Sequence, residues 1–537
     1  MVLPLGPAPS NRVIIVGAGI GGLSAAVALA QQGLQVEVLE ARPLVGGKLR
    51  CQQVAGHTID VGPTVLTMRW VFDELCATAG TTLDELLPLT RAERLARHFW
   101  DDGAQLDLYC DRERSAAAIA AFAGEREAAG FRRFCDYAAR IYAEVEQPFL
   151  RDQRPTVGTL VRRTGLRGLA GLWRIDSQRT MWQALSTFFA EPRLRQLFGR
   201  YATYCGSSPF AAPGTLNLVA HVEQQGVWLI GGGMHRLAEA LAALARRAGA
   251  TIACSAPVEG LWVEGGRVRG VRLRDGECRA ARAVIVNADL STLATRLLDP
   301  PTARQLGLAA TPRAERSLSA LTWATLSPTS AQADATLVRH NVFFHAADYA
   351  DEFDAVLRRG ELPTRPTVYV CAQDRDDDGR IVPSACPPDA RPAATPGADG
   401  PAGARERLLL LVNAPPRGGE RPLAAQELTV CRERVERLLG AHGLALGLAD
   451  APTALQTPDD FETLSPGTGG AIYGPLAHSW RSSFARAGSR TALPGLYLAG
   501  GSVHPGPGLP MVALSGRLAA QSVAEDLGAR PHPRPAR

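Results

Sequence analysis

A glycine run near the N-terminus constrains the fold of this chain more than any other feature. It separates Val13–Val16, an apolar segment with the pattern of a short buried strand, from Leu23–Gln31, which has the pattern of a helix. Gln35–Glu40 then alternates like a second strand and ends on an acidic residue. The glycines follow the spacing G-x-G-x-x-G, at Gly17, Gly19 and Gly22. The order strand, glycine loop, helix, strand and acid predicts a site for a dinucleotide.

Each residue of this unit has a physical task in such a site. Gly17 permits the tight turn, and Gly19 lets the backbone approach a pyrophosphate that the helix N-terminus then stabilises. Gly22 allows the helix to pack closely on the strand, and Glu40 is the expected acceptor for ribose hydroxyls. A glycine motif alone would also fit an ordinary glycine-rich turn. The complete context favours the dinucleotide site.

The residues after the acid favour FAD over NAD. Ala41–Lys48 adds a second glycine pair, Gly46 and Gly47, next to Lys48. This extension resembles the fingerprint of the amine oxidase and carotenoid desaturase flavoproteins, which implies that it runs along the FAD phosphates. We expect Lys48 to contact a phosphate, with a solvated loop lysine as the alternative. The cofactor-binding residues predicted in this half are Gly17, Gly19, Ile20, Gly21, Gly22, Glu40, Ala41, Arg42, Gly47 and Lys48.

The C-terminal end carries the pattern of the flavin half of the site. Gly495–Gly501 is predicted to be a strand that ends in glycines, Ser502–Pro510 a rigid loop, and Met511–Asp526 a helix. Glycines at the end of a strand before a helix N-terminus build a pocket for a flavin ring. We therefore expect the two ends of the chain to fold together. The predicted contacts here and in the intervening sequence are Gly62, Pro63, Thr64, Val258, Gly501, Ser502, Met511 and Val512.

His504 is the one candidate catalytic residue. It lies in the loop expected beside the flavin, and the alternative is that it only orders this loop. The catalytic residues otherwise stay undetermined, since we find no triad or carboxylate pair. Ten cysteines without any CxxC pair indicate free thiols and no metal site.

The composition limits the other classes of function. A hydrophobic content of 46% and a charged content of 21% are those of a globular protein. The net charge of +5 is too small for this length to imply nucleic-acid binding. The N-terminus lacks the pattern of a signal peptide. The longest apolar stretch, Val13–Ala30, contains the glycine run in its middle, so we predict no transmembrane helix.

Nearly the whole chain resembles the bacterial-type carotenoid (phytoene) desaturases. The resemblance is carried by Asp60–Thr67, Gly467–Gly474 and Ser502–Pro510, which are similar to conserved motifs of that group. Within the group, three further stretches look most like the hydroxycarotenoid 3,4-desaturase (methoxyneurosporene dehydrogenase) branch. These stretches are Gly62–Gly80, Arg193–Phe210 and His340–Phe353.

The resemblance implies an α/β fold with a Rossmann-like FAD-binding domain of the amine oxidase and carotenoid desaturase type. An α+β substrate-binding domain is expected to be interleaved with it. We assign residues 1–85, 226–290 and 466–537 to the FAD-binding domain and residues 86–225 and 291–465 to the substrate and membrane-associating domain. The Pro-, Asp- and Gly-rich stretch 374–405 is predicted to be a flexible surface loop and 529–537 a disordered tail.

The implied activity is FAD-dependent formation of a C3–C4 double bond in an acyclic 1-hydroxy or 1-methoxy carotenoid, with oxygen or a quinone as final electron acceptor. Hydride loss from C4 leaves a cation that the polyene delocalises, so the protein mainly positions the substrate and excludes water. The alternatives are a phytoene or neurosporene desaturase or another FAD-dependent carotenoid oxidoreductase. An amine oxidase, or a non-catalytic lipid-binding protein on the same fold, is a more distant alternative.

A carotenoid substrate implies a long apolar channel and access to a membrane. Candidate lining residues are Tyr201–Phe210, Val342–Phe344 and Trp228, each of which could equally be ordinary core. Leu160–Arg174 places leucines and a tryptophan on one helical face and arginines on the other. That pattern fits either an interfacial membrane helix or a helix packed on its own domain. We expect a cytoplasmic protein bound peripherally to the inner photosynthetic membrane.

Overall fold

Strand β1 (Arg12–Val16) lies at the centre of a five-stranded parallel sheet in the computed structural model, which describes residues 11–154, 175–382, 405–478 and 486–529. The strand order is β19-β13-β1-β2-β9. Its members come from the beginning, the middle and the end of the chain, so the prediction that the two chain ends fold together is confirmed. The other strands are β2 (Gln35–Leu39), β9 (Thr251–Ala253), β13 (Ala283–Val286) and β19 (Leu496–Leu498).

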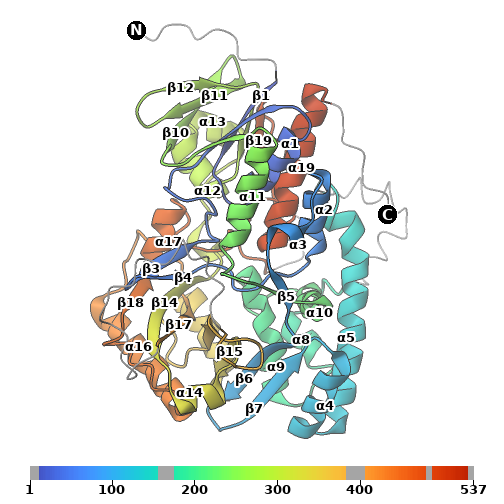
Figure 1. Ribbon diagram of the computed structural model, residues 1–537, viewed down its shortest axis with the longest axis vertical. Coiled ribbons are helices and arrows are strands. Elements are labelled where there is room, and N and C mark those ends of the chain that lie inside the picture. Colours follow the sequence, from blue (N-terminus) through green and yellow to red (C-terminus); the bar gives the residue numbers. More distant parts are fainter. Residues whose placement is uncertain (1–10, 155–174, 383–404, 479–485, 530–537) are drawn as a thin grey trace.

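Both faces of this sheet are covered, because β1 is apolar on both sides. Val13 and Ile15 pack against three helices, α1 (Ile20–Ala30), α11 (Arg236–Arg247) and α19 (Leu509–Leu527). Ile14 and Val16 pack against an antiparallel sheet on the opposite face (Figure 1). That sheet is built from β10 (Val258–Glu264), β11 (Arg267–Leu273) and β12 (Cys278–Ala280). The continuous apolar pattern of β1 is therefore that of a doubly covered parallel strand.

A seven-stranded mixed sheet forms the second half of the molecule, at the bottom of Figure 1. All of its strand pairs are antiparallel except the pair of β15 and β6. The order is β18-β14-β17-β16-β15-β6-β7. The strands are β6 (Arg94–Trp100), β7 (Gln105–Tyr109), β14 (Ser319–Pro328), β15 (His340–Phe344), β16 (Val368–Ala372), β17 (Arg405–Ala414) and β18 (Thr453–Gln456).

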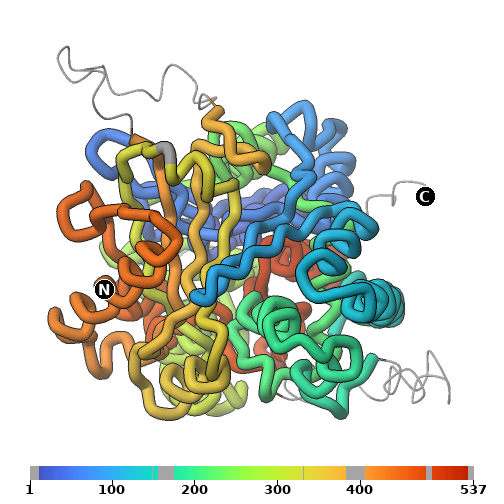
Figure 2. Tube along the Cα trace, turned by 90° about the horizontal axis from the view of Figure 1, so that it is seen from below, coloured from blue at the N-terminus to red at the C-terminus, as the bar shows by residue number. Residues whose placement is uncertain are grey.

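Successive side chains along these strands point to opposite faces of the sheet. Helices cover one face, and the other face lines a cavity. Leu408, Leu410 and Val412 of β17 pack with Cys431 and Val435 of helix α16 (Ala425–Ala441) in one hydrophobic cluster. The residues between them, Leu409, Leu411 and Asn413, line a large cavity. Figure 2 shows the yellow strands of the sheet between orange helical segments and the cyan helices α4 (Arg112–Ala123) and α5 (Glu125–Val145).

Helices α4 and α5 belong to a helical layer with its own aromatic core. Phe131, Phe134, Phe189 and Phe198 pack there against the end of β6. Gly124, at φ +93°, separates α4 from α5. The other helices of the layer are α8 (Met181–Leu185), α9 (Pro192–Gly199) and α10 (Leu218–Gln225), with a 3₁₀ segment, η2 (Arg200–Cys205), after α9.

The remaining elements connect the two halves. The hairpin of β3 and β4 packs on the seven-stranded sheet through Val54, Ile59 and Val61. Among the helices of the described ranges, none has both the length and the hydropathy needed to cross a bilayer. The connecting elements are β3 (Cys51–Val54), β4 (His57–Asp60), α2 (Trp70–Thr78), α3 (Leu83–Leu86), β5 (Leu89–Arg91), β8 (Trp228–Ile230), α12 (Leu290–Thr292), α13 (Pro300–Gln305), α14 (Ala331–Thr336), α15 (Tyr349–Phe353) and α17 (Pro458–Leu464).

Two predicted boundaries differ from the structure. Leu293, Leu297 and Ala303 belong to the hydrophobic cluster beneath the parallel sheet, so the first half extends beyond the boundary predicted at residue 290. The surface loop predicted from residue 374 begins too early. Arg375 is 1% exposed and pairs with Glu406 at 2.7 Å, which fixes this stretch in the fold. Residues 383–404, the amphipathic stretch 160–174 and the tail 530–537 lie outside the described residues.

Candidate cofactor and substrate site

One cavity of about 1430 Å³ lies between the carboxyl ends of the parallel strands and the seven-stranded sheet. This volume exceeds the several hundred cubic ångströms that one drug-sized ligand usually occupies. The cavity begins among the glycines after β1 and continues past the C-terminal glycine loop to the inner face of β17. It therefore has room for a cofactor and a second, long ligand.

The glycine loop after β1 leaves the first turn of α1 open to the cavity. Gly17 has φ +98°, and a Cβ there would lie 2.8 Å from the carbonyl oxygen of Asn287. The N-cap residue Gly19 has no side-chain capping bond, and α1 has no acidic residue in its first turn. The first N–H groups of the helix and its dipole can therefore bind a phosphate group.

Glu40 is held at the end of β2 by two backbone groups. Its Oε2 accepts a hydrogen bond from Ala18 N at 2.7 Å, and its Oε1 accepts one from Arg42 N at 3.0 Å. Each carboxylate oxygen keeps a second lone pair, and the residue lines the cavity. The arrangement leaves Glu40 able to accept hydrogen bonds from ribose hydroxyls.

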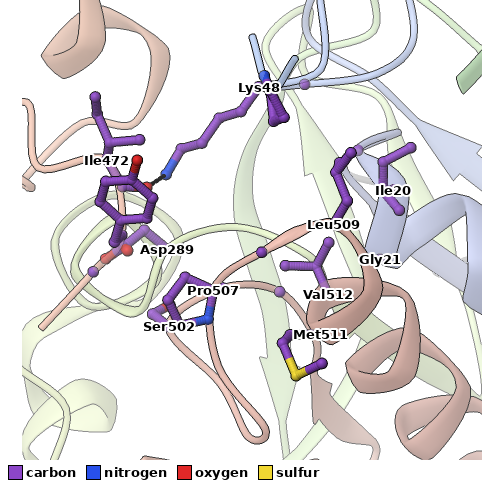
Figure 3. Close-up of a pocket in the computed structure, with 18 of the residues that line it drawn as sticks. Ile20, Gly21, Lys48, Asp289, Ile472, Ser502, Pro507, Leu509, Met511 and Val512 are labelled. Atoms are coloured by element: carbon purple, nitrogen blue, oxygen red, sulfur yellow. Dashed lines mark hydrogen bonds between the residues drawn. The ribbon is translucent and has the colours of Figure 1, made fainter. Parts of the chain in front are cut away.

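A second helix N-terminus faces the same cavity. Helix α19 follows the glycine loop after β19, and its N-cap, Gly508, makes no side-chain capping bond. Met511 and Val512 of its first turn line the cavity beside Ile20 and Gly21 (Figure 3). A Cβ at Gly516 would lie 1.9 Å from the carbonyl oxygen of Gly21, so the two helices pack with backbone nearly in contact. Two helix N-termini therefore converge on one cavity.

Lys48 lines the cavity, and its contact with a phosphate stays a prediction. Its side chain extends away from Ile20 and donates a hydrogen bond from Nζ to the carbonyl of Ile472 (Figure 3). Burial lowers the pKa of Lys48, and the nearby carboxylate of Asp289 raises it.

The predicted cofactor residues lie around this one cavity with a single exception. Gly22 does not line it. A Cβ at Gly22 would lie 2.1 Å from the carbonyl oxygen of Gly17, which agrees with the expected role of this glycine in close helix–strand packing. Two uncapped helix N-termini supply N–H donors and the carboxylate of Glu40 supplies an acceptor, which fits the phosphates and ribose of FAD. The predicted residues that line the cavity are Gly17, Gly19, Ile20, Gly21, Glu40, Ala41, Arg42, Gly47, Lys48, Gly62, Pro63, Thr64, Val258, Gly501, Ser502, Met511 and Val512.

His504 has the environment of a structural residue. It is 3% exposed, and its Nε2 donates to the carbonyl of Asp152 at 3.1 Å while its ring packs edge-on against Phe149. Burial lowers the pKa of His504 to about 4, so the imidazole is neutral at pH 7. It does not line the cavity. These contacts favour the alternative in which His504 orders the loop.

The cavity as a whole has a mainly apolar wall. Thr203, Tyr204 and Cys205 from the predicted lining segment Tyr201–Phe210 line it, whereas Trp228 and Val342–Phe344 belong to the core. Aliphatic residues from the 3₁₀ segment η3 (Gly214–Asn217), α10 and β17 contribute to the wall. They are Leu216, Leu218, Val219, Val222, Leu409 and Leu411.

Two groups of site residues were missed by the sequence reasoning. Asn287 follows β13, and its Nδ2 donates to Gly17 O at 3.2 Å while its backbone limits the space beside the glycines. A polar residue directly after a buried strand could have indicated it, because ligands bind at the carboxyl ends of parallel strands. Arg200 and Glu223 also line the cavity, and no local pattern marks them.

The chain is similar to known proteins over nearly its whole length. The model of the flavin containing amine oxidoreductase family matches residues 20–524. A hydroxyneurosporene desaturase of Rubrivivax gelatinosus is 48% identical over 522 residues, which cover 97% of this chain and 94% of that protein. A protein of the same name from Cereibacter sphaeroides is 42% identical and covers 97% of this chain and 98% of its own. A 4,4'-diapolycopene oxygenase of Methylomonas is 32% identical over 96% of this chain and 99% of its own.

Solved structures share the fold at low identity. Putrescine oxidase with bound putrescine aligns with a TM-score of 0.57 and 17% identity, over 98% of this chain and 100% of that one. Cyclohexylamine oxidase from Brevibacterium oxydans gives a TM-score of 0.55 and 16% identity, over 97% of this chain and 100% of that one. Both likenesses concern the fold.

Proposed function

Because this chain belongs to the flavin-containing amine oxidoreductase family, and within it to the carotenoid desaturases, we propose that it introduces a C3–C4 double bond into an acyclic carotenoid with a hydroxyl or methoxyl group at C1. It is an FAD-dependent oxidoreductase of carotenoid biosynthesis. The observation that carries the finer proposal is the single cavity that joins the FAD-binding residues to an apolar wall. The names of the relatives that are 42% and 48% identical support the hydroxylated substrate.

The residues around the glycine loops would hold FAD. The N-terminus of α1 would bind its phosphates, Glu40 its ribose, and the loop Gly500–Ser502 with the N-terminus of α19 its flavin end. When bound, FAD supplies the acceptor for the hydride that leaves C4 of the substrate.

The protein itself positions the substrate and excludes water from the site. The leucine and valine wall formed by α10 and β17 matches a hydrocarbon chain and excludes water from the reacting carbons. The polyene delocalises the positive charge that develops at C4, so loss of the C3 proton needs no strong base. This account does not require a catalytic histidine, in agreement with the neutral, fully engaged His504.

Expression beside enzymes that make 1-hydroxyneurosporene tests the proposal. We expect the pigment extract to show a product with one additional conjugated double bond, by chromatography with absorption spectra. Co-expression with a phytoene-producing enzyme alone is the matched control. Consumption of phytoene without consumption of the hydroxylated carotenoid would instead indicate a phytoene or neurosporene desaturase. A keto or aldehyde product would indicate an oxygenase.

The site of action and the final electron acceptor form part of the same proposal. A carotenoid partitions into lipid, so the enzyme must collect it from a membrane surface, which we propose is the inner photosynthetic membrane. Oxygen or a quinone would reoxidise the cofactor. Cell fractionation, and product formation under argon with and without added quinone, separate these cases.

A further inference from the structure

One polar cluster interrupts the apolar part of the cavity. Arg200 and Tyr204 come from η2, Glu223 from α10 and Tyr369 from β16, and all four line the cavity. Leucine and valine side chains of α10 and β17 also line this cavity, so a ligand here meets hydrocarbon as well as these polar atoms. A cluster of this kind selects a ligand that carries a polar group at the matching position.

The carboxylate and the tyrosines of this cluster are already hydrogen-bonded. Glu223 accepts from Tyr201 Oη at 2.6 Å and from Tyr204 Oη at 2.7 Å. Tyr369 Oη lies 2.7 Å from both His340 Nδ1 and Thr64 Oγ1. Burial raises the pKa of Glu223, while the two tyrosine hydroxyls and the cation of Arg200 lower it. The positions of these oxygens are therefore fixed.

Arg200 has donors left over. Protein atoms enclose it, and the part of its side chain that stays accessible lines the cavity. No carboxylate in the described ranges lies within 4.0 Å of its guanidinium, which stands 5.6 Å from the ring centre of Tyr204 and 5.3 Å from that of Tyr369. The hydroxyl of Tyr204 is its polar neighbour. A guanidinium has five N–H groups, and Arg200 lines the cavity, so donors remain for a ligand.

The pairing of a cation with a carboxylate identifies the kind of group that fits. A carboxylate on the ligand would be repelled by Glu223, and an amine would be repelled by Arg200. A ligand group of either charge is therefore disfavoured. A hydroxyl can accept from Arg200 and donate to Glu223 at the same time. From this geometry we propose that Arg200 and Glu223 bind the C1 oxygen of the substrate and so determine its selection over the unhydroxylated carotenoid.

The cluster also lies beside the cofactor end of the cavity. Tyr369 is bonded to Thr64, next to Gly62 and Pro63, and Gly206 at the end of η2 approaches the ring of Tyr473 closely enough that a Cβ would lie 2.6 Å from it. In the proposed substrate only C2 separates the oxygen-bearing C1 from C3. An oxygen held by Arg200 therefore places C3 and C4 near the flavin end. This inference rests on the proposed C3–C4 desaturation for its substrate.

The test compares binding of 1-hydroxyneurosporene and neurosporene to the FAD-loaded enzyme, by quenching of protein fluorescence. The wild-type enzyme is expected to bind the hydroxylated carotenoid roughly 10- to 100-fold more tightly, the range for a hydrogen bond to a charged group. In Arg200→Met the preference for the hydroxylated carotenoid is expected to fall below about threefold. In the wild type, bound neurosporene leaves the donors of Arg200 without a partner, and the variant removes this penalty. Turnover is measured separately. If the enzyme does not desaturate the substrate, the proposed function is overturned, while the ratio of the two binding affinities still tests this inference.

A second variant and a control keep the result interpretable. Glu223→Gln retains the size and an acceptor for the tyrosines, and it is expected to reduce the preference for the 1-hydroxy over the 1-methoxy carotenoid, which cannot donate. Thr322→Val is the matched control, because Thr322 lines the same cavity but directs its hydroxyl to Gln456 at 3.3 Å. Flavin content and melting temperature check that each variant is folded. Retention of the full hydroxyl preference in both Arg200→Met and Glu223→Gln, or its equal loss in Thr322→Val, would overturn the inference.

Discussion

The carboxylate of Glu40 accepts a hydrogen bond of 2.7 Å from the backbone N–H of Ala18, which joins the end of the second parallel strand to the glycine loop after the first. This bond connects the acid to the loop that faces the phosphate position. The same residue can thus fix the loop and bind the ribose. Loss of its charge should weaken both functions.

Glu40→Gln is expected to weaken FAD binding by roughly 10- to 100-fold, because one hydrogen bond to a charged acceptor contributes about 1.5–3 kcal/mol. Titration of the apoprotein with FAD measures the effect. Glu37→Gln is the control on the same strand, since Glu37 pairs with Arg12 at 2.7 Å and does not line the cavity. Equal affinities of the two variants for FAD would contradict the role of Glu40.

Gly516→Ala is expected to lower stability by about 1–3 kcal/mol and to reduce flavin content, because the new Cβ forces α19 away from Gly21. Gly440 in α16 offers a matched control. A Cβ there meets nothing within 4 Å, so Gly440→Ala should be stabilising by about 0.5–1 kcal/mol. Thermal unfolding and the ratio of flavin to protein absorbance measure both. An unchanged melting temperature for Gly516→Ala would disprove the close helix contact.

Arg375→Met is expected to destabilise the protein by about 3–5 kcal/mol, because it leaves the buried carboxylate of Glu406 without its partner. The double variant Arg375→Met/Glu406→Gln should recover part of this loss. For comparison, Arg272→Met removes an exposed pair with Glu259 at 3.2 Å and should cost no more than about 1 kcal/mol. Urea unfolding of the wild type, Arg375→Met, Glu406→Gln and the double variant gives the coupling energy. A double variant less stable than Arg375→Met would contradict the expected recovery.

Stability is expected to fall as the pH drops from about 6.5 towards 3. Burial lowers the pKa of His98 to about 3, so the native state keeps this ring neutral while the unfolded chain binds a proton. The loss approaches about 1.4 kcal/mol per pH unit below 6.5. His98→Asn keeps a donor for the carbonyl of Leu106 and should flatten the decline between pH 6.5 and 4. Parallel profiles of melting temperature for variant and wild type would exclude His98 as a cause.

Local patterns predicted the first half of the site because its residues are close in sequence. The turn at Gly17, the helix from Ile20 and the acid at Glu40 lie within one strand–helix–strand unit, where spacing alone fixes the geometry. The glycine loop near Gly501 is similarly local. The hydrogen bond from Lys48 to the carbonyl of Ile472 could not be predicted in this way, because the two residues are 424 positions apart.

The sequence by itself determined the cofactor and the class of fold, because strand and helix periods and glycine spacing are properties of neighbouring residues. Only the tertiary structure decided which residues surround the substrate end of the cavity. Arg200, Glu223 and Tyr369 come from three separate elements, and β17 contributes only alternate side chains. A buried cation with donors facing a cavity looks like any other arginine in the sequence. The role of this arginine depends on its burial and on partners distant in sequence, and both exist only after the chain has folded.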